Sequence, residues 1–125
     1  MGDRGQIRLV SDGEPDIFLY THWEAHYLPQ ILAAALHRGR NRWGDDEYLN
    51  RIIFCEMIQH HVLDESSFGI GTAMHGDVWR VIVVDHRNNR AWFDTGACDE
   101  LGLRKPVTFE EWIELFFEEK KEGQA

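Results

Sequence analysis

The sequence predicts a single α+β domain with a mainly antiparallel sheet of about five strands and with helices packed against that sheet. Three observations predict this class. Short runs of β-branched and aromatic residues are separated by turn formers, two segments carry apolar residues at helical spacing, and a capping box marks the start of a last helix. The expected order is strand, strand, helix, helix, strand, strand, strand, helix.

The length of the chain limits it to one domain. A chain of 125 residues, 43% of them hydrophobic, can form one compact core but is too short for two ordinary domains. We expect one domain over 1–125, with an ordered core over about 5–117 and a frayed tail over 118–125.

The first two strands are expected to form an antiparallel hairpin over 6–10 and 17–20, because the segment between them is dense in turn formers. The run at 17–20 is apolar without interruption, which predicts a central strand covered on both faces. The Thr21 hydroxyl is expected to cap the N–H of Glu24, and the Glu24 carboxylate to reach back to the N–H of Thr21.

Two helices are expected to follow. A short turn over 22–27 leads into a helix that has Pro29 in its first turn and ends at Gly39. The second helix should begin at Asp45 or Asp46 and end near residue 60. Its apolar residues leave no wide polar face, which predicts a helix buried on most sides, either in the core or in an oligomer contact.

Glu56 projects among apolar residues of this second helix, and a buried carboxylate without a partner is costly. We therefore expect Glu56 to be neutralised by His60, by an arginine or by a ligand.

The second half of the chain predicts three strands joined as a meander, over 68–74, 79–85 and 90–94. In the first of them Gly69 and Gly71 alternate with apolar residues, so another element or a ligand is expected to lie against the bare face. An irregular loop over 95–105 precedes a last helix, in which Thr108 is the cap and Glu111 closes the capping box.

The net charge of −9 argues against a general nucleic-acid binder, which needs an excess of Lys and Arg, and indicates that a basic partner would suit the surface. Two cysteines, Cys55 and Cys98, are too few for a disulfide framework and suit a reducing cytosol. No apolar run approaches the roughly 18 residues of a membrane span, so we expect a cytoplasmic protein without a membrane partner.

Four blocks of residues resemble a group of small uncharacterised proteins found in tailed phages, prophages and some bacteria. The blocks are 20–23 (Tyr-Thr-His-Trp), 38–43 with its three arginines, 48–54 and 108–111 (Thr-Phe-Glu-Glu). The likeness runs from about Arg4 to Phe116. It implies a phage or prophage setting, with the host cytoplasm as the compartment, and it carries no activity over to this chain.

Several residues before the second helix are of types that bind anions. They are Arg38, Arg40, Arg42 and Trp43. Guanidiniums, an aromatic plane and free helix N–H groups suit a phosphate or a nucleotide-like ligand. Tyr20 and Trp23, at the mouth between a strand end and a helix start, complete the predicted ligand-binding set. In the alternative interpretation, the arginines bond helix carbonyls and pair with Asp45, Asp46 and Glu47.

No motif identifies a catalytic or metal centre. His22 and His26 are four residues apart but lack the His-Glu-x-x-His order, so we expect surface histidines, no metal and no cofactor. If the protein is an enzyme, the candidate acids and bases are His22, Glu56 and His60.

We therefore predict a non-enzymatic, acidic binding protein that holds a partner protein or a small anionic ligand, with a homodimer as a possible state. The alternative is a hydrolase of a phosphorylated or nucleotide substrate, in which the three arginines grip phosphate.

Overall fold

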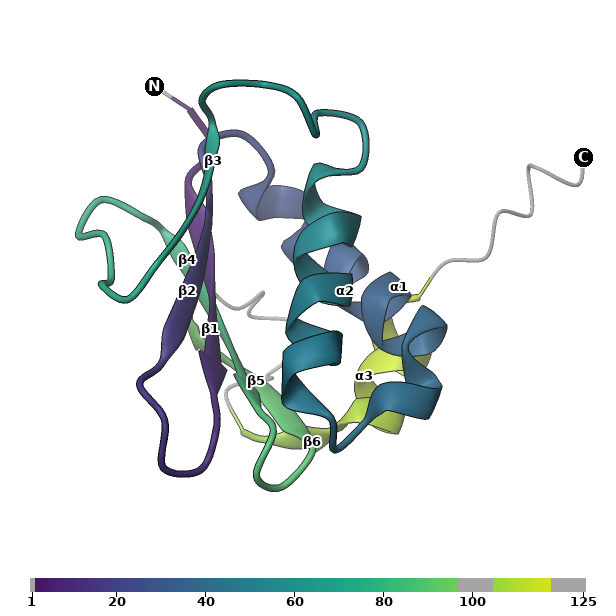
Figure 1. Cartoon of the computed structure of the whole chain (residues 1–125). Helices are drawn as coiled ribbons and strands as arrows, with labels where there is room; N and C mark the ends of the chain where they lie inside the picture. Colours follow the sequence, from purple (N-terminus) through teal and green to yellow (C-terminus); the bar gives the residue numbers. More distant parts are fainter. Residues whose placement is uncertain (1, 97–104, 118–125) are drawn as a thin grey trace, which may run out of the picture.

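The computed structural model describes residues 2–96 and 105–117 and forms an α+β fold, which confirms the predicted class. A six-stranded sheet lies on one side and three α-helices cover one of its faces (Figure 1). The elements in chain order are β1 (Gly5–Val10), β2 (Ile17–Thr21), the 3-10 turn η1 (Ala25–Tyr27), α1 (Leu28–Arg38), the 3-10 turn η2 (Arg40–Arg42), α2 (Asp46–Ile58), β3 (Phe68–Gly71), β4 (Arg80–Asp85), β5 (Arg90–Thr95), β6 (Val107–Thr108) and α3 (Phe109–Phe116).

The strand order is β3-β2-β1-β4-β5-β6, and every neighbouring pair is antiparallel except β1 with β4, which is parallel. The predicted hairpins β1–β2 and β4–β5 are confirmed. The predicted meander is wrong, because β3 pairs with β2 while β4 lies on the far side of β1. The sheet also gains a sixth strand, the two-residue β6.

The burial of the strands explains this order. All six residues of β4 are buried, so β4 belongs in the middle of the sheet, whereas β3 contains two glycines and lies at an edge. The central pair is therefore β1 and β4. The prediction that residues 17–20 form a central strand is wrong in this respect, since β2 is an interior strand second from the edge.

The connection from β3 to β4, residues 72–79, crosses the sheet face that the helices leave open (Figure 1). The buried Gln6 side chain accepts a hydrogen bond from the His75 N–H (2.9 Å) and donates one to the Ala73 carbonyl (3.5 Å). The Tyr20 and His75 rings lie 4.4 Å apart between centroids. The crossover is thus held against the sheet by side chains of β1 and β2.

The core lies between the sheet and the helices. Its largest fully buried side chains come from every layer: Ile7, Leu9, Leu19, Leu28, Leu32, Leu36, Leu49, Ile53, Ile82, Phe93, Phe109 and Trp112. The capping box of α3 is confirmed, with Glu111 N–H donating to the Thr108 hydroxyl (3.0 Å) and Thr108 N–H donating to the Glu111 carboxylate (2.8 Å). The predicted tail 118–125 and most of the predicted loop 95–105, with Cys98, lie outside the described residues.

The prediction that α2 is buried on most sides is wrong. Only Leu49, Ile53 and Met57 of this helix are buried, Tyr48 and Cys55 are exposed, and the helix ends at Ile58 rather than near residue 60. Because α2 contacts α1 and the sheet along one side only, its remaining apolar residues lie at the margins of that contact or in solvent. An oligomer contact through α2 stays a prediction.

Among the helices of residues 2–96 and 105–117, none combines the length and the hydropathy needed to cross a membrane.

Candidate functional site

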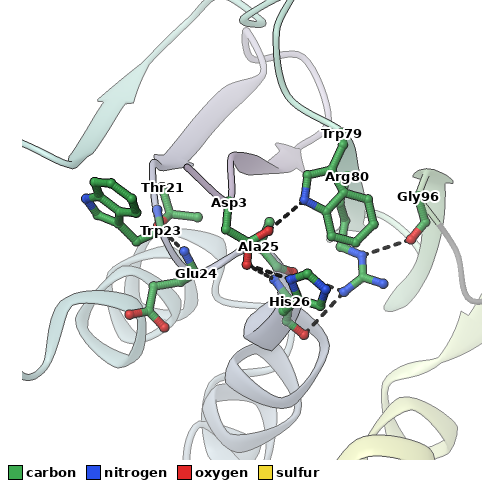
Figure 2. Close-up of polar contacts among 9 residues, drawn as sticks. All are labelled: Asp3, Thr21, Trp23, Glu24, Ala25, His26, Trp79, Arg80 and Gly96. Atoms are coloured by element: carbon green, nitrogen blue, oxygen red, sulfur yellow. Dashed lines mark hydrogen bonds and ion pairs between the residues drawn. The ribbon is translucent and has the colours of Figure 1, made fainter. Parts of the chain in front are cut away.

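The junction of β2 and η1, where ligand binding was predicted, is filled by structural hydrogen bonds (Figure 2). The Thr21 hydroxyl accepts from the N–H groups of Trp23 (3.2 Å) and Glu24 (3.0 Å), which confirms the predicted cap. The Glu24 carboxylate turns away from Thr21 in Figure 2, so only half of the expected capping box forms. Thr21 here tightens a turn and is not presented as a nucleophile.

Asp3 ties the N-terminal segment to this junction. Its carboxylate accepts hydrogen bonds from Trp79 Nε1 (2.7 Å), from the His26 backbone N–H (2.9 Å) and from His26 Nδ1 (2.8 Å). Burial acts to raise the pKa of Asp3, but the bonds from Trp79 and His26 outweigh it and lower the pKa below its ordinary 3.8. Asp3 therefore remains ionised at neutral pH and holds η1 and the start of β4 together.

Arg80, which is only 4% exposed, is the second residue that joins η1 to the sheet. Its guanidinium donates to the Ala25 carbonyl (3.0 Å), the His26 carbonyl (3.3 Å) and the Gly96 carbonyl (2.9 Å), as Figure 2 shows. It also packs against the rings of Trp79 and Phe93, with centroids 4.5 and 5.2 Å away. Sequence reasoning missed this residue, because no local pattern indicates that its guanidinium is buried.

The predicted ligand-binding aromatics Tyr20 and Trp23 both have polar partners within the fold. The Tyr20 hydroxyl lies 3.3 Å from Nδ1 of His22, which also accepts from Arg4 Nε (3.2 Å). The exposed Trp23 donates through Nε1 to the Ser67 hydroxyl (3.1 Å). Their predicted part in ligand binding stays a prediction.

The three arginines have carboxylate partners in three different places. Arg38 pairs with Glu56 on α2, Arg40 pairs with Glu110 on α3, and Arg42 lies 3.6 Å from Asp45. The alternative interpretation therefore describes Arg42 correctly, while the other two find partners far away in the sequence. An anion at this site would have to displace these carboxylates, and anion binding there stays a prediction.

Trp43, the aromatic residue of that predicted set, is half-buried and belongs to the packing of the domain. Its Nε1 donates to the Leu36 carbonyl (3.1 Å), and its ring meets Phe109 edge-on at 5.4 Å. The Arg40 guanidinium lies 5.1 Å from the centre of the indole, which leaves less of the ring for a ligand.

Glu56 is shielded, as predicted, with a side chain only 9% exposed. Its partners are Arg38 and the Gln59 amide, which donates at 3.0 Å. His60, the other predicted catalytic partner, is exposed in the turn that follows α2. Within the part of the chain that the structure describes, no group of three or more His, Cys, Asp or Glu residues could hold a metal ion.

A cavity of about 630 Å³ lies between α2 and the sheet, beside the turn that joins β1 to β2. We call it the α2 groove. Its apolar lining consists of Leu9, Pro15, Ile17, Leu19, Phe54 and Ile70. Its polar lining consists of Ser11, Asp12, Glu14, Asp46, Glu47, Asn50 and Arg51. The groove thus combines an apolar floor with four carboxylates, a composition that suits a ligand both apolar and cationic.

The carboxylates of the groove are available for a ligand. No ion pair among the described residues engages Asp12, Glu14 or Glu47, and Arg51 is the only basic residue in the described lining. A hydrogen bond from Ser11 lowers the pKa of Asp46, with burial opposing it and nearby His86 adding to it. Asp46 is therefore ionised at neutral pH.

His86 supports the wall of the groove from behind. It is 8% exposed, and its Nε2–H donates to the Asn50 side-chain oxygen (2.6 Å), while Nδ1 has no hydrogen-bond partner among the described residues. Burial lowers the pKa of His86 below its ordinary 6.5, and the charges of Asp46 and Asp85 offset only part of that effect. His86 is therefore neutral and fixes the orientation of Asn50.

The pKa of His86 predicts a pH dependence of stability. Because the folded state takes up the His86 proton less readily than the unfolded state, the unfolded chain binds more protons below about pH 6.5. The free energy of unfolding should fall as the pH drops through that range, with a slope of at most about 1.4 kcal/mol per pH unit. Urea unfolding at a series of pH values measures this slope.

The matched variants for that measurement are His86→Gln, which should flatten the slope, and His60→Gln on the surface, which should leave it unchanged. The pKa values of Asp3, Asp46 and Asp85 are also lowered, so those carboxylates contribute only below about pH 5, in a lower range. An unchanged slope in His86→Gln would refute the assignment to His86.

Comparison of the chain with family models, with curated proteins and with solved structures finds no match.

Proposed function

We propose that this protein is a non-enzymatic binding protein whose α2 groove takes an apolar, basic segment of a partner protein. The observation that carries the proposal is the apolar floor with unpaired carboxylates beside it. Burial of apolar side chains would supply affinity, and the carboxylates would select a basic partner and speed its approach. The net charge of −9 also favours a basic partner.

The other predicted activities have weaker support. A small anion would meet the carboxylates of the α2 groove or would have to displace those that pair with Arg38, Arg40 and Arg42. A hydrolase would need Glu56 free of Arg38, and no observation on the described residues favours it. The setting we propose is the cytoplasm, in a phage or prophage context as the resemblance implies, with a basic host protein as the partner class.

The proposal predicts that removing charge from the groove weakens binding of basic peptides. The probe is a fluorescein-labelled peptide of leucines and lysines, compared with the same pattern of leucines and glutamates. The triple variant Asp12→Asn, Glu14→Gln, Glu47→Gln should bind the lysine peptide about twentyfold more weakly, if each of the three exposed pairs contributes ~0.6 kcal/mol, the middle of the usual ~0.2–1 kcal/mol. Fluorescence anisotropy measures the dissociation constants.

A second triple variant, Glu24→Gln, Asp94→Asn, Glu114→Gln, changes the net charge equally but lies away from the groove lining. It should bind the lysine peptide within about threefold of the parent protein. Equal weakening in both variants would mean that the peptide responds to net charge alone, and the groove would then not be the site. Tight binding of the glutamate peptide would also contradict the proposal.

A further inference from the structure

The edge strand β3 presents unpaired backbone groups to solvent. It pairs with β2 in register, and the next pair along, His22 with Ser67, is joined by a hydrogen bond from the His22 N–H to the Ser67 carbonyl (2.8 Å). Hydrogen-bonded pairs alternate along an antiparallel ladder, so Gly69 and Gly71 bond β2. The N–H and C=O groups of Phe68 and Ile70 therefore point outward from the sheet.

This edge strand is short, with four residues, but it lacks several of the other usual protections. Residues 62–72 contain no Lys, Arg or Pro, and β3 shows no bulge against β2, although such features commonly block pairing with another chain. Large apolar side chains are exposed beside it: Ile70 is 60% and Leu63 is 91% exposed. The loop that holds Leu63 is anchored to β3 by His61, whose ring lies 5.4 Å from that of Phe68.

The two glycines of β3 leave space on the open face of the sheet. We expected another element or a ligand against them. No element of the described chain fills this space, since a Cβ at Gly69 or Gly71 would meet no atom within 4 Å, and a ligand there stays a prediction. Both glycines instead line a cavity of about 200 Å³ with Phe18 and Tyr20. Large side chains of a neighbouring strand commonly cover glycines at a sheet edge, so this face would accept aromatic or β-branched residues.

The other face of β3 belongs to the α2 groove, since Ile70 lines both the groove and the strand edge. Gly71 pairs with Phe18, one residue from the start of β2, so this end of β3 lies nearest the β1–β2 turn that carries Asp12 and Glu14. A strand beside β3 would thus have apolar neighbours along its middle and carboxylates beyond one end.

We propose that an extended segment of the partner protein adds to β3 as a seventh strand, with apolar or aromatic side chains beside Phe68 and Ile70 and basic side chains at the Gly71 end. This inference rests on the proposed function and specifies how the partner binds. The backbone bonds to Phe68 and Ile70 supply affinity, and alternate side chains fill the groove and the glycine cavity. A basic segment fits better than a second copy of this chain, because two chains of net charge −9 repel each other.

The test uses short synthetic peptides in which alternating valine and phenylalanine are joined to a run of lysines, at the N-terminal end in one peptide and at the C-terminal end in the other. Ile70→Pro removes the outward N–H without touching the bonds to β2, and proline is tolerated on edge strands. Ile70→Thr is the matched control, because it keeps the N–H and suits a strand. The tighter of the two peptides should bind Ile70→Pro at least about tenfold more weakly than Ile70→Thr.

Two further measurements do not depend on the folding of the proline variant. A second form of the peptide carries N-methyl groups on the alternate residues whose N–H groups would donate to β3. It should bind the unaltered protein at least about tenfold more weakly than the unmethylated peptide. Amide hydrogen exchange at Phe68 and Ile70 should slow when the parent peptide binds.

The outcomes separate this inference from the proposed function. Suppose that the triple variant Asp12→Asn, Glu14→Gln, Glu47→Gln weakens binding, whereas Ile70→Pro and N-methylation of the peptide do not. Strand addition is then refuted, and the groove remains the site. If neither peptide binds the unaltered protein, strand addition is refuted, and the leucine and lysine peptide then decides the proposed function alone. If sedimentation shows a dimer that Ile70→Pro dissociates, a second copy occupies the edge and the proposed occupant is wrong.

Discussion

Replacing Trp112 by alanine should lower the free energy of unfolding by ~3–5 kcal/mol, the loss expected when a large buried aromatic is truncated. Trp112 is fully buried between the sheet and α1, and its ring lies 5.1 Å from Phe93 and 4.8 Å from Phe116. Its Nε1 donates to the Pro29 carbonyl (3.0 Å), at the start of α1. The substitution would therefore open a cavity and also remove the indole donor from the Pro29 carbonyl, which keeps only its bond within α1. Urea unfolding followed by circular dichroism measures the loss.

Two controls on the same helix separate these contributions. Trp112→Phe keeps most of the apolar volume but removes the donor, so it should cost about 1–3 kcal/mol. Leu115→Ala removes an exposed side chain from the opposite side of α3 and should change stability by no more than about 0.5 kcal/mol. If Trp112→Ala were no less stable than Leu115→Ala, α3 would not pack as described.

Replacing Arg80 by methionine should lower the free energy of unfolding by ~2–4 kcal/mol, the second largest loss that we expect. Methionine fills much of the same space but donates no hydrogen bond, so the carbonyls of His26 and Gly96 lose the guanidinium donor and the Ala25 carbonyl keeps only the Leu28 N–H. Loss of the link should also loosen η1 from the sheet. Urea unfolding gives the stability, and amide exchange at residues 25–28 reports the local loosening.

Arg80→Lys should recover only part of that stability, because a single ammonium cannot reproduce the planar fork that reaches carbonyls on two sides. The matched control is Arg90→Met on the adjacent strand, where the arginine is exposed and bonds only the carbonyls of its own turn. That change should stay within about 0.5 kcal/mol. Equal stability of Arg80→Met and the parent protein would show that water satisfies the three carbonyls.

The elements that sequence reasoning predicted well depend on residues close together in the chain. The capping box of α3 needs only Thr108 and Glu111, three residues apart, and the end of α1 needs only Gly39. Both hairpins follow from turn formers between two apolar runs. Such local patterns determine where an element begins and ends, but not which elements become neighbours.

The wrong predictions concern contacts between residues that are far apart in the sequence. The apolar residues around α2 predicted a buried helix, yet burial depends on how many elements surround it, and α2 is covered on one side only. Likewise, β3 and β4 are consecutive strands, but the buried β4 pairs with β1 and leaves β3 at an edge. For Arg38 and Arg40 the partners are Glu56 and Glu110, which no local spacing indicated.

The groove was not predicted, because its carboxylates come from two segments with evident local roles. Asp12 and Glu14 were interpreted as part of a turn, and Asp46 as a helix start. The excess of carboxylates over lysine and arginine in these segments was the one available signal. The negative charge was interpreted as a property of the whole surface and not of one site. Only the packing of α2 beside the β1–β2 turn brings these charges together over an apolar floor.

The sequence by itself determined the α+β class, the two hairpins, the ends of α1, the start of α3 and the acidic composition. The tertiary structure alone decided the strand order, the partners of the arginines, the burial of Arg80 and His86, the α2 groove and the open edge of β3. The physical reason is the separation along the chain over which each interaction acts. Capping, turn chemistry and periodicity act over a few residues, whereas burial and ion pairing depend on which distant segments share the limited interior of the domain.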